Sequence, residues 1–218
     1  MEKKNKKALV WGASLLIAFV LWTVLVCFVD VQAIGPEGSS VGFATLNGYV
    51  HDLTGVNMSL YVITDWLGLI PIGTAFGFAV VGLVQLIKHK TLWKVDHSIL
   101  SLGVFYIVVM AVYVLFETVV INYRPTLIDG YLEASYPSST TMLVMCVMPT
   151  AMMQLRSRIK NDVIRRCVTI AIAAFIAFMV IGRLVSGVHW ITDIIGGALV
   201  SAAIVWMYYA ISNVATKY

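Results

Sequence analysis

Long apolar runs recur along the chain and alternate with short polar stretches. Each run has about 17–28 residues, enough for a helix that rises about 1.5 Å per residue to cross roughly 30 Å of hydrocarbon. The first run follows a lysine-rich head but is too long for the apolar part of a signal peptide, so it predicts a retained helix. The pattern predicts six transmembrane helices, near residues 8–31, 60–87, 98–121, 139–155, 167–185 and 190–214.

The composition is typical of an integral membrane protein. Of 218 residues, 60% are hydrophobic and 12% are charged, whereas a soluble domain carries about 25% charge. The expected fold class is therefore all-α, a single polytopic domain over residues 1–218 that forms a six-helix transmembrane bundle. The mixed segment 32–59 predicts an outer loop with a short interfacial helix. The three cysteines lie in apolar runs and predict neither a disulfide framework nor a metal site.

Basic residues are distributed unevenly between the ends of the predicted helices. All but two of the 15 lysines and arginines precede the first helix or follow the second, fourth and sixth. The positive-inside rule makes that side cytoplasmic and places both termini there. The formal net charge of +4 is thus a topology signal, and no nucleic-acid partner is expected. The two exceptions, Arg124 and Arg183, lie near the outer face, where a cation is costly and indicates a functional site.

Candidate chemistry lies in three outer segments, "ETVVINYRP" (117–125), "YPSSTT" (136–141) and "GRLVSGVHWITD" (182–193). His189 and Asp193 are four residues apart, so on a helix the carboxylate can orient the imidazole and leave its other nitrogen as a base or nucleophile. Pro137–Ser138 is typical of a helix start, whose free N–H groups favour an anion. Together with the planar donors of Arg124 and Arg183, these groups predict an oxyanion site suited to phosphate.

These segments resemble the three motifs of the type 2 phosphatidic acid phosphatase superfamily, Lys-x6-Arg-Pro, Pro-Ser-Gly-His and Ser-Arg-x5-His-x3-Asp. Arg183, His189 and Asp193 match the spacing of the third motif in full. The resemblance implies a metal-independent lipid phosphatase without a cofactor, which works through a phosphohistidine at the outer face of the cell membrane. It implies His189 as the nucleophile and Asp193 as the residue that orients it. The residues implied to hold the phosphoryl group are Arg124, Arg183, Ser138, Ser139 and Thr140.

Four positions depart from these motifs. Glu117 replaces the lysine of the first motif and, if ionised, repels phosphate, so we expect an ion pair with Arg124 or Arg183, or a neutral acid that donates a proton. Thr140 replaces the histidine that in this family protonates the leaving oxygen, a contribution worth about 10²–10⁴-fold. The other two departures are Ser139 for glycine and Gly182 for serine.

Without that acid, a weakly basic leaving group is favoured. The first hypothesis is therefore a phosphatase that prefers lipid diphosphates to monophosphates, with undecaprenyl diphosphate as the candidate in a bacterial host. The second is a catalytically weak or inactive relative that binds or transports lipid phosphates. The third is an unrelated six-span transporter, although such proteins typically place polar groups at mid-membrane rather than at one face. The oligomeric state and the lipid partners beyond the substrate and the surrounding membrane stay open.

Overall fold

A computed structural model describes residues 2–215, whose regular structure is helical apart from isolated β-bridges. This confirms the all-α fold class. Short elements follow the first long helix: the 3-10 turn η1 (Pro36–Gly38) and α2 (Ala44–Thr54), with a second 3-10 turn, η2 (Leu92–Lys94), further on. The other helices are α1 (Glu2–Phe28), α3 (Met58–Leu67), α4 (Leu69–His89), α5 (His97–Thr118), α6 (Ser139–Arg158), α7 (Asp162–Val185) and α8 (Ile191–Ala215); all of these except α3 have 20 residues or more.

Several helices are long and apolar enough to cross a membrane, which supports a multi-pass membrane protein. Within the described residues there are five such stretches, Lys3–Phe28, Met58–His89, His97–Thr118, Asp162–Val185 and Ile191–Ser212. The helix α6, which corresponds to the fourth of the six predicted spans, is less apolar and is not among these five stretches. It contacts α4, α5, α7 and α8, so its surface faces other helices more than lipid and needs fewer apolar residues.

The predicted second span is two helices rather than one. The helix α3 ends at Leu67, and α4 begins at Leu69, although their apolar character is continuous. At the junction, the Gly68 N–H donates to the carbonyl oxygens of Thr64 and Asp65, both at 3.0 Å. This tight turn separates α3 from α4, and α3 faces the site described below.

Three other helix bounds differ from the predicted spans by several residues, in two cases because the helix continues into polar sequence. The first helix begins at Glu2 rather than near residue 8, since lysine is a good helix former. The helix α7 begins at Asp162 rather than near residue 167, because the Asn161 side chain caps it by accepting from the N–H groups of Val163 and Ile164. At the other extreme, α5 ends at Thr118, three residues before the predicted end.

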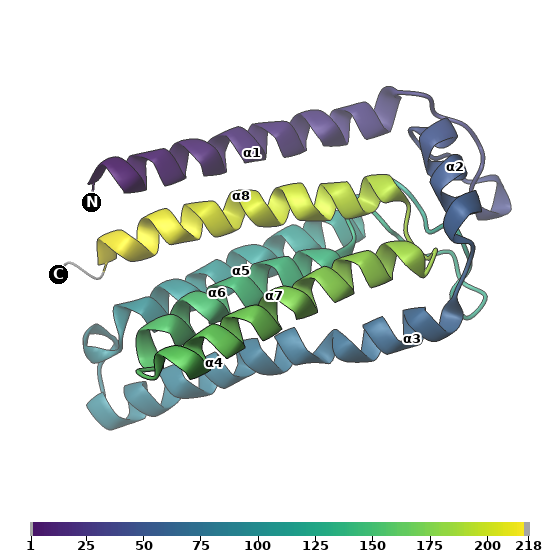
Figure 1. Cartoon of the computed structure of the whole chain (residues 1–218). Coiled ribbons are helices and arrows are strands. Elements are labelled where there is room, and N and C mark those ends of the chain that lie inside the picture. The colour runs from purple at the N-terminus through teal and green to yellow at the C-terminus, as the bar shows by residue number, and fades with distance from the viewer. Residues whose placement is uncertain (1, 216–218) are drawn as a thin grey trace.

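The long helices run side by side, with α6 inside the group and α1 packed along α8 (Figure 1). The close approach of α1 and α8 favours Gly12, since a Cβ there would lie 2.8 Å from Cγ of Met207 and 3.1 Å from the carbonyl oxygen of Ala203. The main buried apolar cluster draws side chains from four helices and a loop: Phe19, Val26, Leu102, Phe105, Val109, Tyr136, Met142, Cys146, Val200, Ile204 and Tyr208.

The two ends of the bundle differ. One end carries the start of α1 and the tight turn between α6 and α7, as Figure 1 shows. The other end carries α2, the long loop 119–138 and the α7–α8 connection. The loop folds back on itself through a β-bridge between Tyr123 and Ala134. The three motif segments meet at this second end.

Candidate active site

The third motif segment spans the end of α7, a turn and the start of α8. Arg183 lies in the last turn of α7, His189 lies in the connection, and Asp193 lies in the first turn of α8. All three are buried, with relative exposures of 1%, 3% and 0%. Because α8 begins only at Ile191, His189 lies before the helix and Asp193 lies inside it. The expected pairing of His189 with Asp193 thus forms across the start of α8.

The turn before His189 is braced against the start of α3. Gly187 has a φ of +68°, and a Cβ there would lie 1.8 Å from the carbonyl oxygen of Gly55, so only glycine fits. The N–H of Asn57, the N-cap of α3, donates to the carbonyl oxygen of Ser186 at 2.9 Å. The position of His189 thus depends on a contact with a segment that is far away in the sequence.

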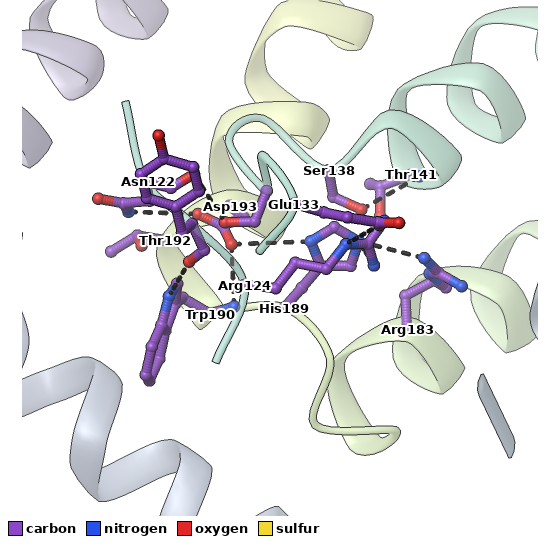
Figure 2. Close-up of polar contacts among 12 residues, drawn as sticks. Asn122, Arg124, Glu133, Ser138, Thr141, Arg183, His189, Trp190, Thr192 and Asp193 are labelled. Atoms are coloured by element: carbon purple, nitrogen blue, oxygen red, sulfur yellow. Dashed lines mark hydrogen bonds and ion pairs between the residues drawn. The ribbon is translucent and has the colours of Figure 1, made fainter. Parts of the chain in front are cut away.

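Asp193 is held by donors on three sides (Figure 2). Its Oδ2 accepts from the N–H of Trp190 at 3.0 Å, and its Oδ1 accepts from Nδ2 of Asn122 at 3.4 Å. The first contact caps the start of α8 with a side chain from its third residue, as in a capping box. The same Oδ2 lies 3.7 Å from Nδ1 of His189, a distance typical of catalytic pairs that tighten when substrate binds.

The Nε2 atom of His189 faces two guanidinium groups. It lies 3.2 Å from Nη2 of Arg183 and 3.5 Å from Nη1 of Arg124. Because guanidinium groups only donate, Nε2 must accept, and the imidazole proton belongs on Nδ1, toward Asp193. Burial, and then the positive charges of Arg124 and Arg183, hold the pKa of His189 well below its ordinary value of 6.5. The imidazole is therefore neutral at physiological pH and carries a lone pair on Nε2.

Each of these arginines is held by a carboxylate on its other side. Arg124 Nε lies 3.0 Å from Oε2 of Glu133, and Arg183 Nη1 lies 3.7 Å from Oδ1 of Asp65. The ring of Tyr61 lies against both guanidinium groups, 5.0 Å from Cζ of Arg183 and 6.0 Å from Cζ of Arg124. Such contacts over an aromatic face are favourable. They hold two like charges beside one imidazole nitrogen.

Several buried donors of this site have no hydrogen-bond partner within the described chain. They include Nε and Nη1 of Arg183, whose side chain is 1% exposed, and Nδ1 of His189. A buried guanidinium with unmet donors is costly. An anion placed at His189 Nε2 would receive donors from both arginines, so the arrangement suits a phosphoryl group.

The second motif segment forms the start of α6. Ser138 is the N-cap, and its Oγ accepts from the N–H of Thr141 at 3.5 Å. The Ser138 N–H donates to the carbonyl oxygen of Asp193 at 3.0 Å, which ties α6 to α8. Ser139 and Thr140 occupy the first turn, where N–H groups without helical partners and the positive end of the helix dipole favour an anion.

Two cavities meet beside these groups. An open polar cavity of about 790 Å³ reaches Arg124, and an adjoining apolar cavity of about 500 Å³ passes between α3–α4, α5 and α6. They share Asp65, Tyr113 and Ser139. The polar cavity is lined by Tyr61, Asp65, Tyr113, Glu117, Val120, Tyr123, Arg124, Leu132, Glu133, Ala134 and Ser139, and the apolar one by Asp65, Gly68, Leu69, Ile72, Val109, Met110, Tyr113, Ser139, Thr140, Met142 and Leu143.

Residues 121–217 match the sequence model of the PAP2 superfamily, the group of type 2 phosphatidic acid phosphatases. The predicted resemblance is confirmed. The match includes Arg124, Ser138 and the whole third motif, and it begins after Glu117. A comparison with curated proteins gives no match.

The fold is also that of a PAP2 membrane protein of known structure. The chain is similar to the crystal structure of a transmembrane PAP2 type phosphatidylglycerolphosphate phosphatase from Bacillus subtilis, with a TM-score of 0.58. The similarity covers 93% of this chain and 96% of that one at 17% sequence identity. The N-terminal helices, which lie outside the matched family segment, therefore belong to the same fold.

Three of the four departures from the PAP2 motifs, Glu117, Ser139 and Thr140, line the cavities. Glu117 lines the polar cavity together with Arg124. The ion pair expected between Glu117 and an arginine is replaced, among the described residues, by the pairs that the arginines form with Glu133 and Asp65. Thr140 lines the apolar cavity, which Asp65 and Ser139 also line.

Sequence analysis missed the residues that hold the two arginines. Asp65 could have been found, because a carboxylate inside a predicted span marks a functional position by default. Glu133 and Tyr61 carried no such signal, because Glu133 lies in a predicted loop and Tyr61 is an aromatic residue near the end of a predicted span. Asn122 lies in the first motif segment and was passed over, although it donates to Asp193.

Proposed function

We propose that this protein is a membrane lipid phosphatase in which His189 attacks phosphorus at the outer membrane face. The observation that carries the proposal is the convergence of Arg124 and Arg183 on His189 Nε2, at 3.5 and 3.2 Å, with donors of Arg183 left unmet. A phosphoryl group placed there meets donors and a nucleophile at once. The PAP2 resemblance supports the same reading.

The reaction proposed has two displacements. In the first, the Nε2 lone pair forms a bond to phosphorus, and the bond between phosphorus and the leaving oxygen breaks. The imidazole then carries a positive charge, which the carboxylate of Asp193 stabilises across 3.7 Å. In the second, a water oxygen bonds to phosphorus, the P–N bond breaks, and its electrons return to Nε2. The protons of that water stay with inorganic phosphate and bulk water, and no step requires a metal ion.

The phosphoryl oxygens are proposed to bind Arg124, Arg183 and the free N–H groups at the start of α6. Donors placed where charge develops are commonly the largest catalytic contribution of an active site. Ser138 serves as the helix cap that orients those N–H groups, since its Oγ accepts from Thr141. Ser139 and Thr140 present the first turn to the cavities.

The preferred substrate is proposed to be a lipid diphosphate, with undecaprenyl diphosphate as the best candidate in a bacterial host. A lipid phosphate is a weak base and leaves without a proton, whereas an alkoxide leaving from a monoester needs the acid that Thr140 cannot supply. The apolar cavity that joins the polar one at Asp65, Tyr113 and Ser139 offers a place for the first part of an apolar tail.

The proposed orientation places six spans in the membrane, with α3–α4 as one span, α6 as another and both termini in the cytoplasm. The lysines in the first turns of α1, and the arginines in the last turn of α6 and the first turns of α7, lie at one end of the bundle, and the site lies at the other. The positive-inside rule makes the first end cytoplasmic.

An alternative function, an inactive protein that binds or transports lipid phosphates, draws on one observation. Three carboxylates, Asp65, Glu117 and Glu133, line the cavity above the arginines and oppose a highly charged diphosphate. If they prevent turnover, lipid phosphate binds without being cleaved.

The experiment that separates these functions measures phosphate release by purified protein in detergent, with a metal chelator present. Undecaprenyl diphosphate and phosphatidic acid are offered in parallel to the wild type, His189→Ala and Thr140→His. We expect release that requires His189, faster with the diphosphate, and a gain of about 10-fold or more on phosphatidic acid in Thr140→His. Faster cleavage of phosphatidic acid by the wild type would contradict the leaving-group argument. Binding without release would favour the alternative.

A further inference from the structure

A basic cavity lies at the opposite end of the bundle from His189. It has a volume of about 660 Å³ and lies between the end of α6 and the first turns of α7. Its lining residues are Arg156, Asp162, Arg165, Arg166, Thr169 and Ile170. None of them belongs to the proposed active site, which is separated from them by the length of α7.

The charges on this cavity do not balance. Arg165 forms an ion pair with Asp162, three residues earlier on α7. Arg156 and Arg166 add two positive charges for which the cavity lining provides no second carboxylate. Arg158, on the same turn of the chain, is directed elsewhere, since its Nη2 lies 3.0 Å from Oδ2 of Asp96. The cavity thus presents a net charge of about +2 to a ligand.

The cavity also passes from a charged rim to apolar side chains. Ile170, which lines the cavity, is one turn beyond Arg166 on α7 and is 59% exposed. In a membrane, the arginines would lie at headgroup level, and Ile170, deeper along α7, would face acyl chains. The positive-inside rule explains why basic residues occur at this end, but it does not explain why three arginines line one hollow at a helix–helix junction.

We infer that this cavity binds the phosphate of an anionic phospholipid headgroup in the leaflet at this end of the bundle. Guanidinium groups match phosphate oxygens with paired donors. Basic pockets between membrane helices recognise anionic headgroups in this way, and each basic residue near the surface contributes to the attraction. The ligand requires both parts of the cavity, a phosphate for the arginines and an acyl chain for the exposed face of α7.

The experiment is native mass spectrometry of the full-length protein in detergent, titrated with phosphatidylglycerol or with phosphatidylcholine of the same acyl chains. The test variant is Arg156→Gln with Arg166→Gln. The matched control, Lys88→Gln with Lys94→Gln, removes two positive charges from the same end. Every variant keeps the proposed active site, so lipid bound there is common to all.

We expect the wild type and the lysine control to prefer phosphatidylglycerol, and the arginine variant to bind it about 10- to 30-fold more weakly. Equal losses in both variants would show attraction by general surface charge and overturn the inference. So would displacement of phosphatidylglycerol by millimolar inorganic phosphate, which would indicate a site for free anions. If the wild type binds phosphatidylglycerol no better than phosphatidylcholine, the inference is overturned, and this result does not depend on whether any variant folds. Retention of binding in Arg156→Lys with Arg166→Lys, at reduced affinity, would support it.

Discussion

Two polar clusters lie at opposite ends of α6, and they differ in how completely their buried polar groups are hydrogen-bonded. The Gln154 cluster consists of Asp96, Ser98, Gln154, Arg158 and Tyr208. In it, the Gln154 amide donates to the Tyr208 hydroxyl at 2.9 Å and to the Ser98 carbonyl oxygen at 3.2 Å, and its oxygen accepts from Ser98 Oγ at 3.1 Å. Arg158 Nη2 pairs with Asp96 at 3.0 Å. The amide is thus fully bonded.

The His189 cluster consists of Arg124, Arg183, His189 and Asp193, and its groups are not saturated. Nε and Nη1 of Arg183 and Nδ1 of His189 have no hydrogen-bond partner in the described chain. Folding tolerates this cost, which indicates a ligand that completes the cluster. The comparison shows that buried charge alone does not identify a site in a membrane protein. Buried donors without partners, next to an imidazole nitrogen that faces two guanidinium groups, are the more specific signal.

The largest effect we predict is on activity in Arg183→Met. Removal of a donor to the transferred group should lower kcat/KM by about 10²–10³-fold. Thermal stability should be unchanged or higher, because an apolar side chain replaces a buried charge with unmet donors, while Asp65 remains solvated at 59% exposure. Phosphate release and thermal unfolding of the same preparation check both parts. If Arg183→Met instead lowered the free energy of unfolding by as much as it raised the activation free energy, Arg183 would have a structural role.

The next effect is stabilisation by a phosphate analogue. Orthovanadate at about 100 times its Kd should stabilise the wild type by about 2.7 kcal/mol, because it binds only the folded site. Arg183→Met should lose this shift. Thermal unfolding with and without vanadate measures it. An equal shift in both proteins would mean that vanadate binds elsewhere.

In the Gln154 cluster, Gln154→Leu should reverse the pattern seen with Arg183→Met. Loss of the amide leaves the Tyr208 hydroxyl and Ser98 without their buried partner, so stability should fall by about 1–3 kcal/mol. Activity at temperatures well below unfolding should stay within about twofold of the wild type, and the vanadate shift should persist. Activity loss without destabilisation would contradict the structural role of this cluster.

Two glutamates on the rim of the polar cavity should respond in opposite directions to the same change of charge. Glu117→Gln removes repulsion of an anionic substrate and should lower KM a few-fold. Glu133→Gln loosens Arg124, to which Glu133 binds at 3.0 Å, and should raise KM by a similar factor. Each serves as the charge-matched control for the other in steady-state kinetics. A fall in kcat for Glu117→Gln would instead identify Glu117 as a proton donor.

The smallest effect is on pH dependence. The pKa of His189 is lowered by burial and by the two arginines, so the free protein loses the neutral imidazole only well below pH 6.5. The acid limb of kcat/KM that belongs to His189 should therefore lie below that value. The stability contributed by the neutral form is present above pH 6.5 and declines as the pH falls below it. An acid limb near pH 7 that disappears in an Arg124→Gln variant would contradict this charge argument.

Much of the arrangement followed from the sequence, and the reasons for the rest are physical. The apolar runs and the basic residues at their ends predicted the long helices, because both depend directly on whether a segment lies in lipid or in water. The spacing from Arg183 to Asp193 predicted their proximity, because that segment is local. The pairs Arg124–Glu133 and Arg183–Asp65 could not be predicted, since they depend on how a loop and α3 pack against α7. The break at Gly68 lies inside a continuous apolar run, which hides it from hydropathy.

The central claim is that His189 becomes phosphorylated during turnover. The direct measurement is to mix the protein with a lipid diphosphate labelled with ³²P at its terminal phosphate, quench it in alkaline detergent within milliseconds and map the labelled peptide. We predict an alkali-stable, acid-labile phosphoryl group on His189, absent in His189→Ala and present at higher occupancy when hydrolysis of the P–N bond is slow. Phosphate release with no labelled peptide, or label on a residue other than His189, would contradict the account.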